Sequence, residues 1–481
     1  MRLTTLSHAG LAVDSGGQQL ICDPWLTGSC YWRSWWNYPP VTSELLESLQ
    51  PDYIYLTHLH WDHFQGPSLR KFGKRPRILV PKSPDTRMWR DLQQMGFRNV
   101  TEIEHAGSMD LGSGFRITSY QFNLFMDSAL VIEADGVTLL NANDSKFMGE
   151  PLGQIMRKHG PIDFTFRSHS SANSRLCYEI IDDPTEAVDD FERYVKDFAD
   201  FAVASGCRYA IPFASNHCYL HKDVFRFNSL VMTPQHVADY FARTNIASPE
   251  VKVMVSGDSW SDEQGFQIAP NDFFTNRDEH LRHYATQNQQ VLDAFYAKEA
   301  RVNVTREQME RYFARFAKAI PWLARRRYKN HPICYVVSSG ERVVFMEVDL
   351  YRGGAVREID SCDDRSHPIQ IHTSAAILRH CMSVDLFSHL AISKRVRYRV
   401  TSRLKKHVVL LNLLFNCYEY EMIPVRRLWS RRFIGVWLTR WREVLLYVRI
   451  VFNLARRRRF DMSKYLPPAR IARIETPAQR L

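Results

Sequence analysis

The stretch THLHWDHF, residues 57–64, constrains this chain more than any other. It places His58, His60, Asp62 and His63 within six positions, directly behind the apolar run 53–56. Imidazole suits zinc and iron, and a carboxylate adds negative charge. Residues two apart on an extended segment point the same way, so His58 and His60 can bind one ion. Where the strand breaks into a turn, Asp62 and His63 can face a second ion, so the stretch predicts a metal site.

Short strands separated by turns and helices make up the first half of the chain. The patterns predict strands at 2–6, 19–23, 53–57, 77–80, 116–122, 129–133, 137–140, 163–166 and 209–212. They predict helices near 43–49, 84–95, 184–204 and 233–243. Beyond these, helical patterns run from about 280 to 325, strands are expected at 333–350 and 355–360, and a helix at 373–392. We expect four parts: an α/β domain at 1–275, a helical connector at 276–330, a small α+β domain at 331–420 and a basic amphipathic helical tail at 421–481.

The net charge of +11 is concentrated in that tail. Residues 421–481 contain 15 basic and 4 acidic residues, so the rest of the chain is balanced. On a helix, Phe433, Trp437, Trp441 and Val448 would share an apolar stripe, with arginines on another face. Such a helix suits an anionic membrane surface. The alternative is a basic helix packed on the protein's own acidic surface, and nucleic acid is the least favoured partner because no reading module precedes it.

The lack of a signal-peptide pattern and the spacing of the cysteines favour a cytoplasmic protein. The nine cysteines include no C-x-x-C pair, which is typical of reduced thiols. The sequence opens without a signal-peptide pattern and contains no run of 18 apolar residues. We therefore expect a cytoplasmic location, with membrane association only through the tail.

The motif H-x-H-x-D-H after a strand resembles the signature of the metallo-β-lactamase superfamily. Four further stretches are similar to the metallo-β-lactamase-like part of CMP-N-acetylneuraminate hydroxylase and its bacterial relatives: SHAGLAV near the start, CDPWLTG at 22–28, RSWWNYPP at 33–40 and PFASNHCYLH at 212–221. The resemblance covers roughly residues 1–230 and implies an α/β fold, an αββα sandwich with a dinuclear metal site at one edge. Residues 330–400 resemble sterol-carrier-like domains, with a plain α+β dimerisation module as the alternative.

The resemblance assigns metal ligands residue by residue. His58 and His60 match ligands of the first metal, and Asp62 and His63 match ligands of the second. Asp144, in LLNANDS, matches the carboxylate that bridges both. That role suits a carboxylate, because its two oxygens can neutralise two cations at once. A turn-forming Asx cap is the alternative for Asp144.

The sequence departs from the family pattern at two places. Asn123 stands roughly where the family supplies a third His to the first metal, and Asp127 follows four residues later. A carboxylate ligand at Asp127 would favour iron or manganese, and a turn at the start of a strand is its alternative role. For the last ligand, the position after the strand favours His217, whereas the match to the relatives favours His221.

Six residues are candidates for contact with substrate, because they lie near the expected metal edge: His8, Trp25, Asn123, His169, Asn173 and Arg175. Each has a structural alternative. His8 and Trp25 suit ordinary core packing, and the Ser/Asn-rich stretch 167–179 suits a surface loop.

These features predict a metal-dependent hydrolase with a small-molecule substrate. Two divalent ions, with zinc favoured and iron or manganese as alternatives, would lower the pKa of a bound water. Asp62 and Asp144 would act in catalysis by orienting that water. The alternatives are a dinuclear iron oxygenase, and a peripheral lipid- or ligand-binding protein whose metal site is not catalytic. The hydroxylase's Rieske cluster needs a C-x-H pair, and because this sequence has none we expect no Rieske domain.

Overall fold

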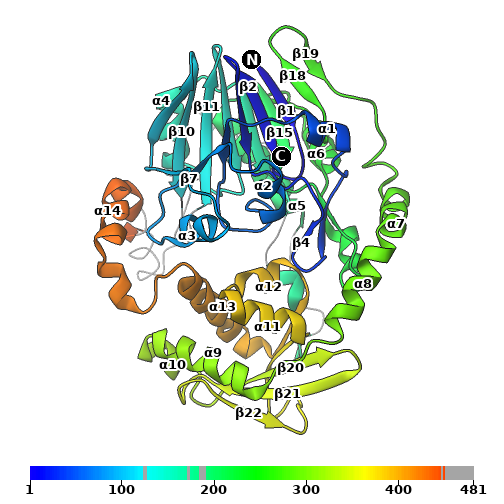
Figure 1. Cartoon of the computed structure of the whole chain (residues 1–481), viewed down its shortest axis with the longest axis vertical. Coiled ribbons are helices and arrows are strands. Elements are labelled where there is room, and N and C mark those ends of the chain that lie inside the picture. Colours follow the sequence, from blue (N-terminus) through cyan, green and yellow to red (C-terminus); the bar gives the residue numbers. More distant parts are fainter. Residues whose placement is uncertain (123–126, 171–173, 184–190, 446–447, 450–481) are drawn as a thin grey trace, which may run out of the picture.

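The computed structural model describes residues 1–122, 127–170, 174–183, 191–445 and 448–449. Two β-sheets face each other in its upper part (Figure 1). The first sheet has eight strands, in the order β19 (Gly265–Gln267), β18 (Ser259–Ser261), β1 (Arg2–Thr5), β2 (Leu11–Ser15), β3 (Gln18–Cys22), β6 (Tyr53–Tyr55), β7 (Arg77–Pro81) and β8 (Val100–Ile103). The second has seven, in the order β17 (Glu250–Val251), β15 (Tyr209–Phe213), β13 (Phe164–Ser168), β12 (Val137–Asn143), β11 (Asp127–Ala134), β10 (Phe115–Phe122) and β9 (Gly107–Gly112).

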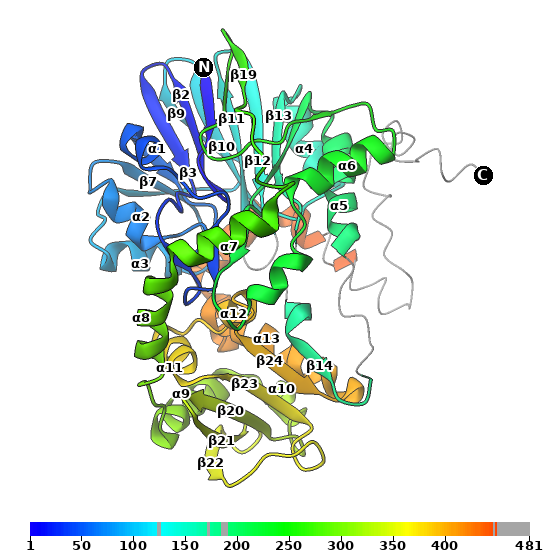
Figure 2. The same cartoon turned by 90° about the vertical axis from the view of Figure 1, so that its right-hand side faces the viewer.

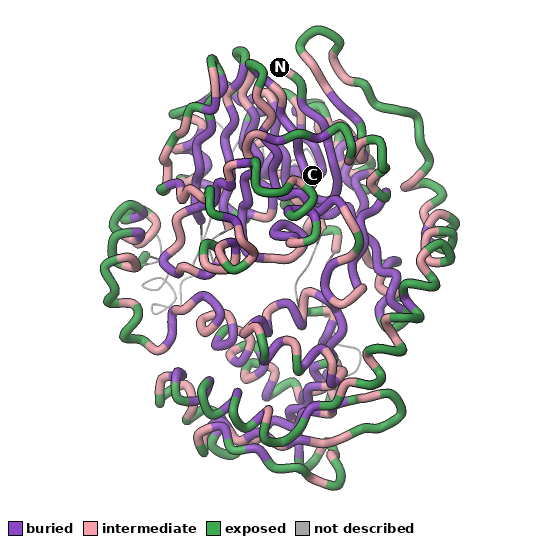
Figure 3. The backbone as a smooth tube through the Cα atoms, in the orientation of Figure 1, coloured by how far each residue is buried: buried purple, intermediate pink, exposed green. Residues whose placement is uncertain are grey.

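Alternation along these strands builds three apolar layers, because successive side chains point to opposite faces of a sheet. Leu20, Leu130 and Phe166 belong to the fully buried core between the two sheets, and Figure 3 shows the buried sandwich strands in the upper half of the molecule. The outer face of the first sheet packs against α2 (Gly66–Lys71) and α3 (Arg87–Gln94). The outer face of the second packs against α4 (Glu150–His159), α5 (Phe191–Ser205) and α6 (Pro234–Arg243). The predicted αββα sandwich is confirmed.

A third sheet lies at the opposite end of the molecule (Figure 2). Its strands are ordered β14 (Tyr178–Ile180), β24 (Val396–Val400), β23 (Ile369–Ser374), β20 (Ile333–Ser339), β21 (Arg342–Asp349) and β22 (Ala355–Ile359). The helices α7 (Arg277–Gln287), α8 (Gln289–Glu299), α9 (Arg306–Ala319) and α10 (Trp322–Arg326) lead into it. Its first strand comes from residues expected to form a surface loop, and a local pattern does not detect a strand whose partner lies far along the chain.

Three helices lie between the third sheet and the sandwich (Figure 1): α11 (Ala375–Val384), α12 (Ser388–Ile392) and α13 (Lys405–Glu419). The single helix predicted at 373–392 is therefore divided in two. Asp385 ends α11 with a left-handed backbone, at φ 52°. Asp tolerates this conformation better than most side chains do. The break turns the start of α12 toward the sandwich.

The structure also tests several helices predicted from the sequence, among them those of the tail. The helices predicted at 43–49 and 84–95 are α1 (Ser43–Ser48) and α3. Of the helix predicted at 184–204, residues 184–190 lie outside the described part, and α5 begins at Phe191. The tail contains α14 (Arg431–Thr439), and residues 450–481 are also outside the described part. Among the helices of the described residues, none combines the length and apolar character needed to cross a bilayer. The proposed four-domain division stays a prediction.

Candidate metal centre

The metal-binding motif follows β6 and folds into a tight turn. The backbone N–H groups of His63 and Phe64 both donate to the carbonyl oxygen of His60, over 3.0 and 2.7 Å. This turn carries Asp62 and His63 back over the end of the strand, beside His58. Side chains that are close in sequence thereby face a common point.

The potential ligand atoms gather around His63. Its Nε2 lies 3.4 Å from Asp62 Oδ2 and 3.3 Å from Asp144 Oδ2. His60 joins the group, with its Nδ1 2.8 Å from His58 Nε2. Two sets of donors have their ligand atoms within 4.8 Å of one another: His8, Asp62 and His63, and His58, His63 and Asp144. The structure therefore brings the four motif residues and Asp144 into one cluster, and it places His8 beside them.

The charges in this cluster suit a divalent cation. Burial raises the pKa of Asp144, but the hydrogen bond and charge of His63 outweigh burial and hold that pKa below its usual range. Burial lowers the pKa of His58 well below its usual value, so its ring is neutral and offers a lone pair. An ionised Asp144 and a neutral His58 are in the form in which these two groups bind metal.

His217 provides a further test of whether the cluster fits a metal. It belongs to a small sheet of β4 (Ser29–Cys30), β5 (Trp35–Asn37) and β16 (His217–Tyr219), and its ring stacks on Trp35 at 3.7 Å between centroids and 2° between planes. The ring is buried in the wall of the cavity that holds the motif. Neither ring nitrogen has a hydrogen-bond partner among the described residues. An unpartnered buried nitrogen is costly, and coordination to an ion would satisfy it.

His221 is directed elsewhere. Its Nε2 lies 3.7 Å from Glu299 and its Nδ1 lies 3.6 Å from Asp223. Its ring meets that of Tyr296 on α8 edge-on, at 4.7 Å between centroids. Among the described residues that line the motif's cavity, His217 is included and His221 is not.

Asp23 directly follows β3 and lies behind the cluster, where it supports His63. Its Oδ2 lies 2.9 Å from His63 Nδ1, and it accepts hydrogen bonds from the N–H and hydroxyl of Thr57. The carboxylate therefore fixes the Nδ1 proton of His63 and leaves Nε2 free to face Asp62 and Asp144. A carboxylate behind a ligating imidazole is a common arrangement at metal sites. The sequence gives no local signal for this role, because it depends on a contact 40 residues away.

Asp62 is held on two sides. The hydroxyl of Tyr31 donates to its Oδ1, and Nε2 of His8 lies 3.1 Å from its Oδ2. Trp25 packs on His8 at 5.6 Å between ring centroids, but its indole does not line the cavity. His8 thus lies at the site as expected, whereas Trp25 lies one layer behind it.

The remaining substrate-contact candidates are more dispersed. His169 is buried, and its backbone N–H donates to Ser215, while its neighbours Ser168 and Ser170 line the metal cavity. Arg175 is exposed on a short 3₁₀ turn and does not line that cavity. Asn123 and Asn173 lie outside the described residues.

The C-terminal region closes the metal cavity, which has a volume of about 390 Å³. The sandwich supplies the motif, and the opposite wall comes from α12, α13 and the residue after α13: Phe387, Ser388, Ala391, Ile392, Asn412, Asn416 and Tyr420. His389 of α12 is also buried here, with its ring 4.6 Å from Trp61 and 5.6 Å from His60 between centroids. The sequence offered no signal for this wall, because its residues are about 330 positions from the motif.

Glu419, a buried carboxylate, fixes the position of this wall. Its Oε1 accepts the backbone N–H groups of Phe387 and Ser388, where α12 begins. Burial raises the pKa of Glu419 to about 7, against opposing hydrogen bonds. The unfolded chain ionises near pH 4.5, so this group lowers the free energy of unfolding progressively as pH rises from 4.5 to 7.

We expect Glu419→Gln to stabilise the protein at pH 8 by about 3 kcal/mol, because the amide retains the Oε1 acceptor and carries no buried charge. At pH 4.5 the variant and the wild type should be equally stable. Urea unfolding at the two pH values measures the difference, with the exposed Glu341→Gln as matched control. A variant less stable than the wild type at pH 8 contradicts this account.

Comparison with known proteins finds partial relatives, and no family model matches. A Mycolicibacterium smegmatis protein named for a Rieske 2Fe-2S iron–sulfur centre is 26% identical over 245 residues, which are 47% of this chain and 46% of that protein. The cytidine monophosphate-N-acetylneuraminic acid hydroxylase of Pan troglodytes is 33% identical over 152 residues, 30% of this chain and 26% of the hydroxylase. The chain thus spans less than half the length of these curated relatives.

Solved structures of low sequence identity also align. Isothiocyanate hydrolase from Delia radicum gut bacteria aligns over 54% of this chain and 99% of its own, with 16% identity and a TM-score of 0.41. CmlA, a diiron β-hydroxylase from Streptomyces venezuelae, aligns over 54% of this chain and 53% of its own, with 18% identity and a TM-score of 0.39. The fold assignment rests on the sandwich topology and on the motif at the end of β6. On these grounds the chain has a metallo-β-lactamase fold with a candidate metal centre, and it resembles part of the CMP-N-acetylneuraminate hydroxylases.

Proposed function

We propose that this chain is a dinuclear metal-dependent hydrolase acting on a small molecule. The observation that carries the proposal is the convergence of two carboxylates, the buried Asp62 and the partly exposed Asp144, on His63 Nε2, at 3.4 and 3.3 Å. When bound, two ions would lower the pKa of a water molecule and polarise an oxygen of the substrate. Two sets of ligands sharing Asp144 would hold them: His58, His60 and Asp144, and Asp62, His63, Asp144 and His217.

The chain's own residues prepare this site. Tyr31 and His8 hold Asp62 in one orientation, and Asp23 sets the proton of His63 away from the cluster. The wall formed by α12 and α13 covers one side of the cavity, and reduced contact with water there would strengthen electrostatic interactions inside. Lys146, which also lines the cavity, adds a cation suited to an anionic group of a substrate.

A dinuclear iron oxygenase is the second candidate, and one observation favours it. Asp127, at the start of β11, lines the metal cavity. A further carboxylate near a site that lacks the family's third His favours iron or manganese over zinc. The similarity to a hydroxylase over 152 residues points the same way.

The metal content of protein purified without added metal decides between the two candidates. Two equivalents of zinc, with a colourless protein, are expected for the hydrolase. Iron with an absorption band in the visible range contradicts that proposal and supports the oxygenase. Protein without any bound transition metal contradicts both.

We also propose that the tail docks on an anionic phospholipid surface. Seven of the 15 large hydrophobic side chains that are exposed in the described residues lie between 425 and 448. Five of them recur at 4,3,4,3 spacing along α14 and the helical segment that begins after the turn at Arg440: Ile434, Leu438, Trp441, Leu445 and Val448. The stripe expected from the sequence is partly wrong, since Phe433 and Trp437 are half-buried.

The opposite face of the tail is fixed to the sandwich. Val436 and Arg440 are buried, and Arg432 forms an ion pair with Glu102. The exposed face therefore points outward, flanked by the exposed Arg442 and Arg449. Arginines beside exposed Trp and Leu complement anionic headgroups above an apolar interior.

Leu438→Asp combined with Trp441→Asp should reduce binding to phosphatidylcholine vesicles containing phosphatidylserine by at least about tenfold, because it places charge on the apolar face. Wild-type protein should bind these vesicles, bind pure phosphatidylcholine less, and dissociate at high salt. Co-sedimentation measures binding, and the matched control is Val343→Asp, at an exposed position of β21.

Equal co-sedimentation of the wild type and the double variant contradicts membrane docking. Two other partners for this face give distinct results. A dimer that light scattering detects without vesicles, and that the double variant abolishes, identifies a second copy. Vesicle binding that appears only after residues 450–481 are deleted identifies that segment as the cover. Either result overturns the proposal.

A further inference from the structure

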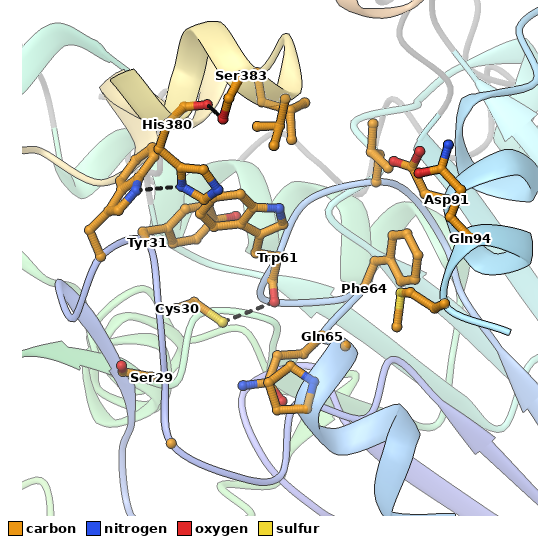
Figure 4. Close-up of a pocket in the computed structure, with 18 of the residues that line it drawn as sticks. Ser29, Cys30, Tyr31, Trp61, Phe64, Gln65, Asp91, Gln94, His380 and Ser383 are labelled. Carbon is orange, nitrogen blue, oxygen red and sulfur yellow. Dashed lines mark hydrogen bonds between the residues drawn. The ribbon is translucent and has the colours of Figure 1, made fainter. Parts of the chain in front are cut away.

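A cavity larger than the metal cavity lies behind the metal motif, on the side away from the candidate ligands. Its volume is about 880 Å³, within the range of small-molecule sites. It lies where the loop 27–33, the motif turn, α3 and the end of α11 meet. Figure 4 shows the rings of Tyr31 and Trp61 on one side of this space, with Asp91 and Gln94 of α3 across from them.

The motif itself is the wall between the two cavities. His58, His60 and Asp62 line the metal cavity, whereas Leu59 and Trp61 line the larger one. Residues 58–63 form a bend and a turn, so neighbouring side chains of this loop point to different sides of it. Any ligand in the larger cavity therefore contacts residues whose direct neighbours are the candidate metal ligands.

Tyr31 links the two sides of this wall. Its ring lines the larger cavity and stacks on Trp61, at 5.8 Å between centroids and 19° between planes. Its hydroxyl passes through the wall and donates to Asp62.

The lining indicates the chemistry of the ligand. Trp32 meets Trp61 edge-on at 5.1 Å between centroids and donates from Nε1 to Nδ1 of His380, so the cavity carries fixed aromatic rings. Arg33 donates to Ser29, and no carboxylate of the described residues lies within 4.0 Å of its guanidinium. Aromatic faces beside a cation without a counter-charge suit a planar ring bearing an acidic group.

The two other arginines that line the cavity already form ion pairs with carboxylates. Arg87 pairs with Asp91 and donates to backbone carbonyls at the end of α11. Arg90 pairs with Glu421. Among the arginines described in the lining of this cavity, Arg33 is therefore the one without a carboxylate partner. It lies on the same loop as Tyr31.

We propose that this larger cavity, here called the rear cavity, binds a small aromatic anion, and that its occupancy strengthens metal binding through the hydrogen bond from Tyr31 to Asp62. A ligand stacked on Trp61 presses that indole against the buried ring of Tyr31, and the restricted hydroxyl holds Asp62 in the orientation of a metal ligand. Because coupling between two sites is reciprocal, metal must strengthen ligand binding by the same factor. The inference depends on the metal centre proposed above.

The test uses two probes that share a ring and differ in charge, 1-naphthoate and 1-naphthylmethylammonium. Quenching of tryptophan fluorescence should show 1-naphthoate binding at least about tenfold more tightly, with most of this preference lost in Arg33→Gln. The matched control is Arg352→Gln, at an exposed arginine in the turn after β21. Zinc affinity, measured by chelator competition, should rise at least about fivefold when 1-naphthoate is saturating.

Tyr31→Phe separates binding from coupling. The variant keeps the ring and loses the hydroxyl, so 1-naphthoate should still bind within about twofold while the effect on zinc affinity disappears. If the wild type binds no zinc, the metal centre is wrong. If it binds zinc and 1-naphthoate without any coupling, or prefers the cationic probe, the metal centre stands and the rear-cavity inference is overturned.

Discussion

Asp144→Asn is expected to weaken the binding of metal by more than about 100-fold, because even groups behind the ligands change affinity by up to that factor. Asp144 lies 3.3 Å from His63 and belongs to the His58 set of donors. A neutral amide in its place cannot balance the charge of two cations. His58→Ala should likewise lose most of its metal while keeping its fold.

Metal content by mass spectrometry and far-ultraviolet circular dichroism check these results together. The matched control is Asp197→Asn, an aspartate exposed on α5. Full metal occupancy in Asp144→Asn would remove its bridging role, and full occupancy in His58→Ala would remove the assignment of the first ion.

Glu299→Gln is expected to lower the free energy of unfolding at pH 7 by about 3 kcal/mol. Both carboxylate oxygens of Glu299 accept from Arg395, at 2.9 Å, which joins α8 to the residue before β24. Burial raises the pKa of Glu299, but the nearby His221 and the charge of Arg395 lower it to about 2. The variant leaves the guanidinium of Arg395 buried without its main counter-charge.

The pH dependence has a definite sign. Because the folded-state pKa is depressed, the stabilisation is fully present above pH 4.5 and is lost as pH falls from 4.5 to about 2. Urea unfolding should therefore show a large difference between wild type and Glu299→Gln at pH 7, and almost none at pH 2. The exposed Glu310→Gln serves as control. Equal stability of the two proteins at pH 7 refutes the role of this pair.

The parts of the fold that local patterns predict are those with local causes. The strand before the motif, the alternation of the sandwich strands and the grouping of His58, Asp62 and His63 all follow from residue spacing. Asp144 joins them because it directly follows β12, whose end meets the same edge of the sandwich.

The parts that escaped prediction depend on contacts distant in sequence. Asp23 and Tyr31 act on the motif across 40 and 31 positions, and neither residue type signals such a role on its own. The wall from α12 and α13 depends on how a whole C-terminal region sits on the sandwich. For His217 and His221, both histidines fit a ligand pattern, and only the stacking on Trp35 and the contact with Glu299 distinguish their surroundings.

The strand β14 has a consequence for how the chain is made. It pairs in parallel with β24, and Glu179 forms an ion pair with Arg399, 220 positions later (Figure 2). At a synthesis rate of about 5–20 residues per second, roughly 10–45 s pass between the appearance of the two partners on the ribosome. The sandwich strands up to β13 emerge before this strand, which must wait with an unpaired edge. Slower translation lengthens that wait, so a nascent chain of this protein should depend on chaperones that shield exposed strand edges.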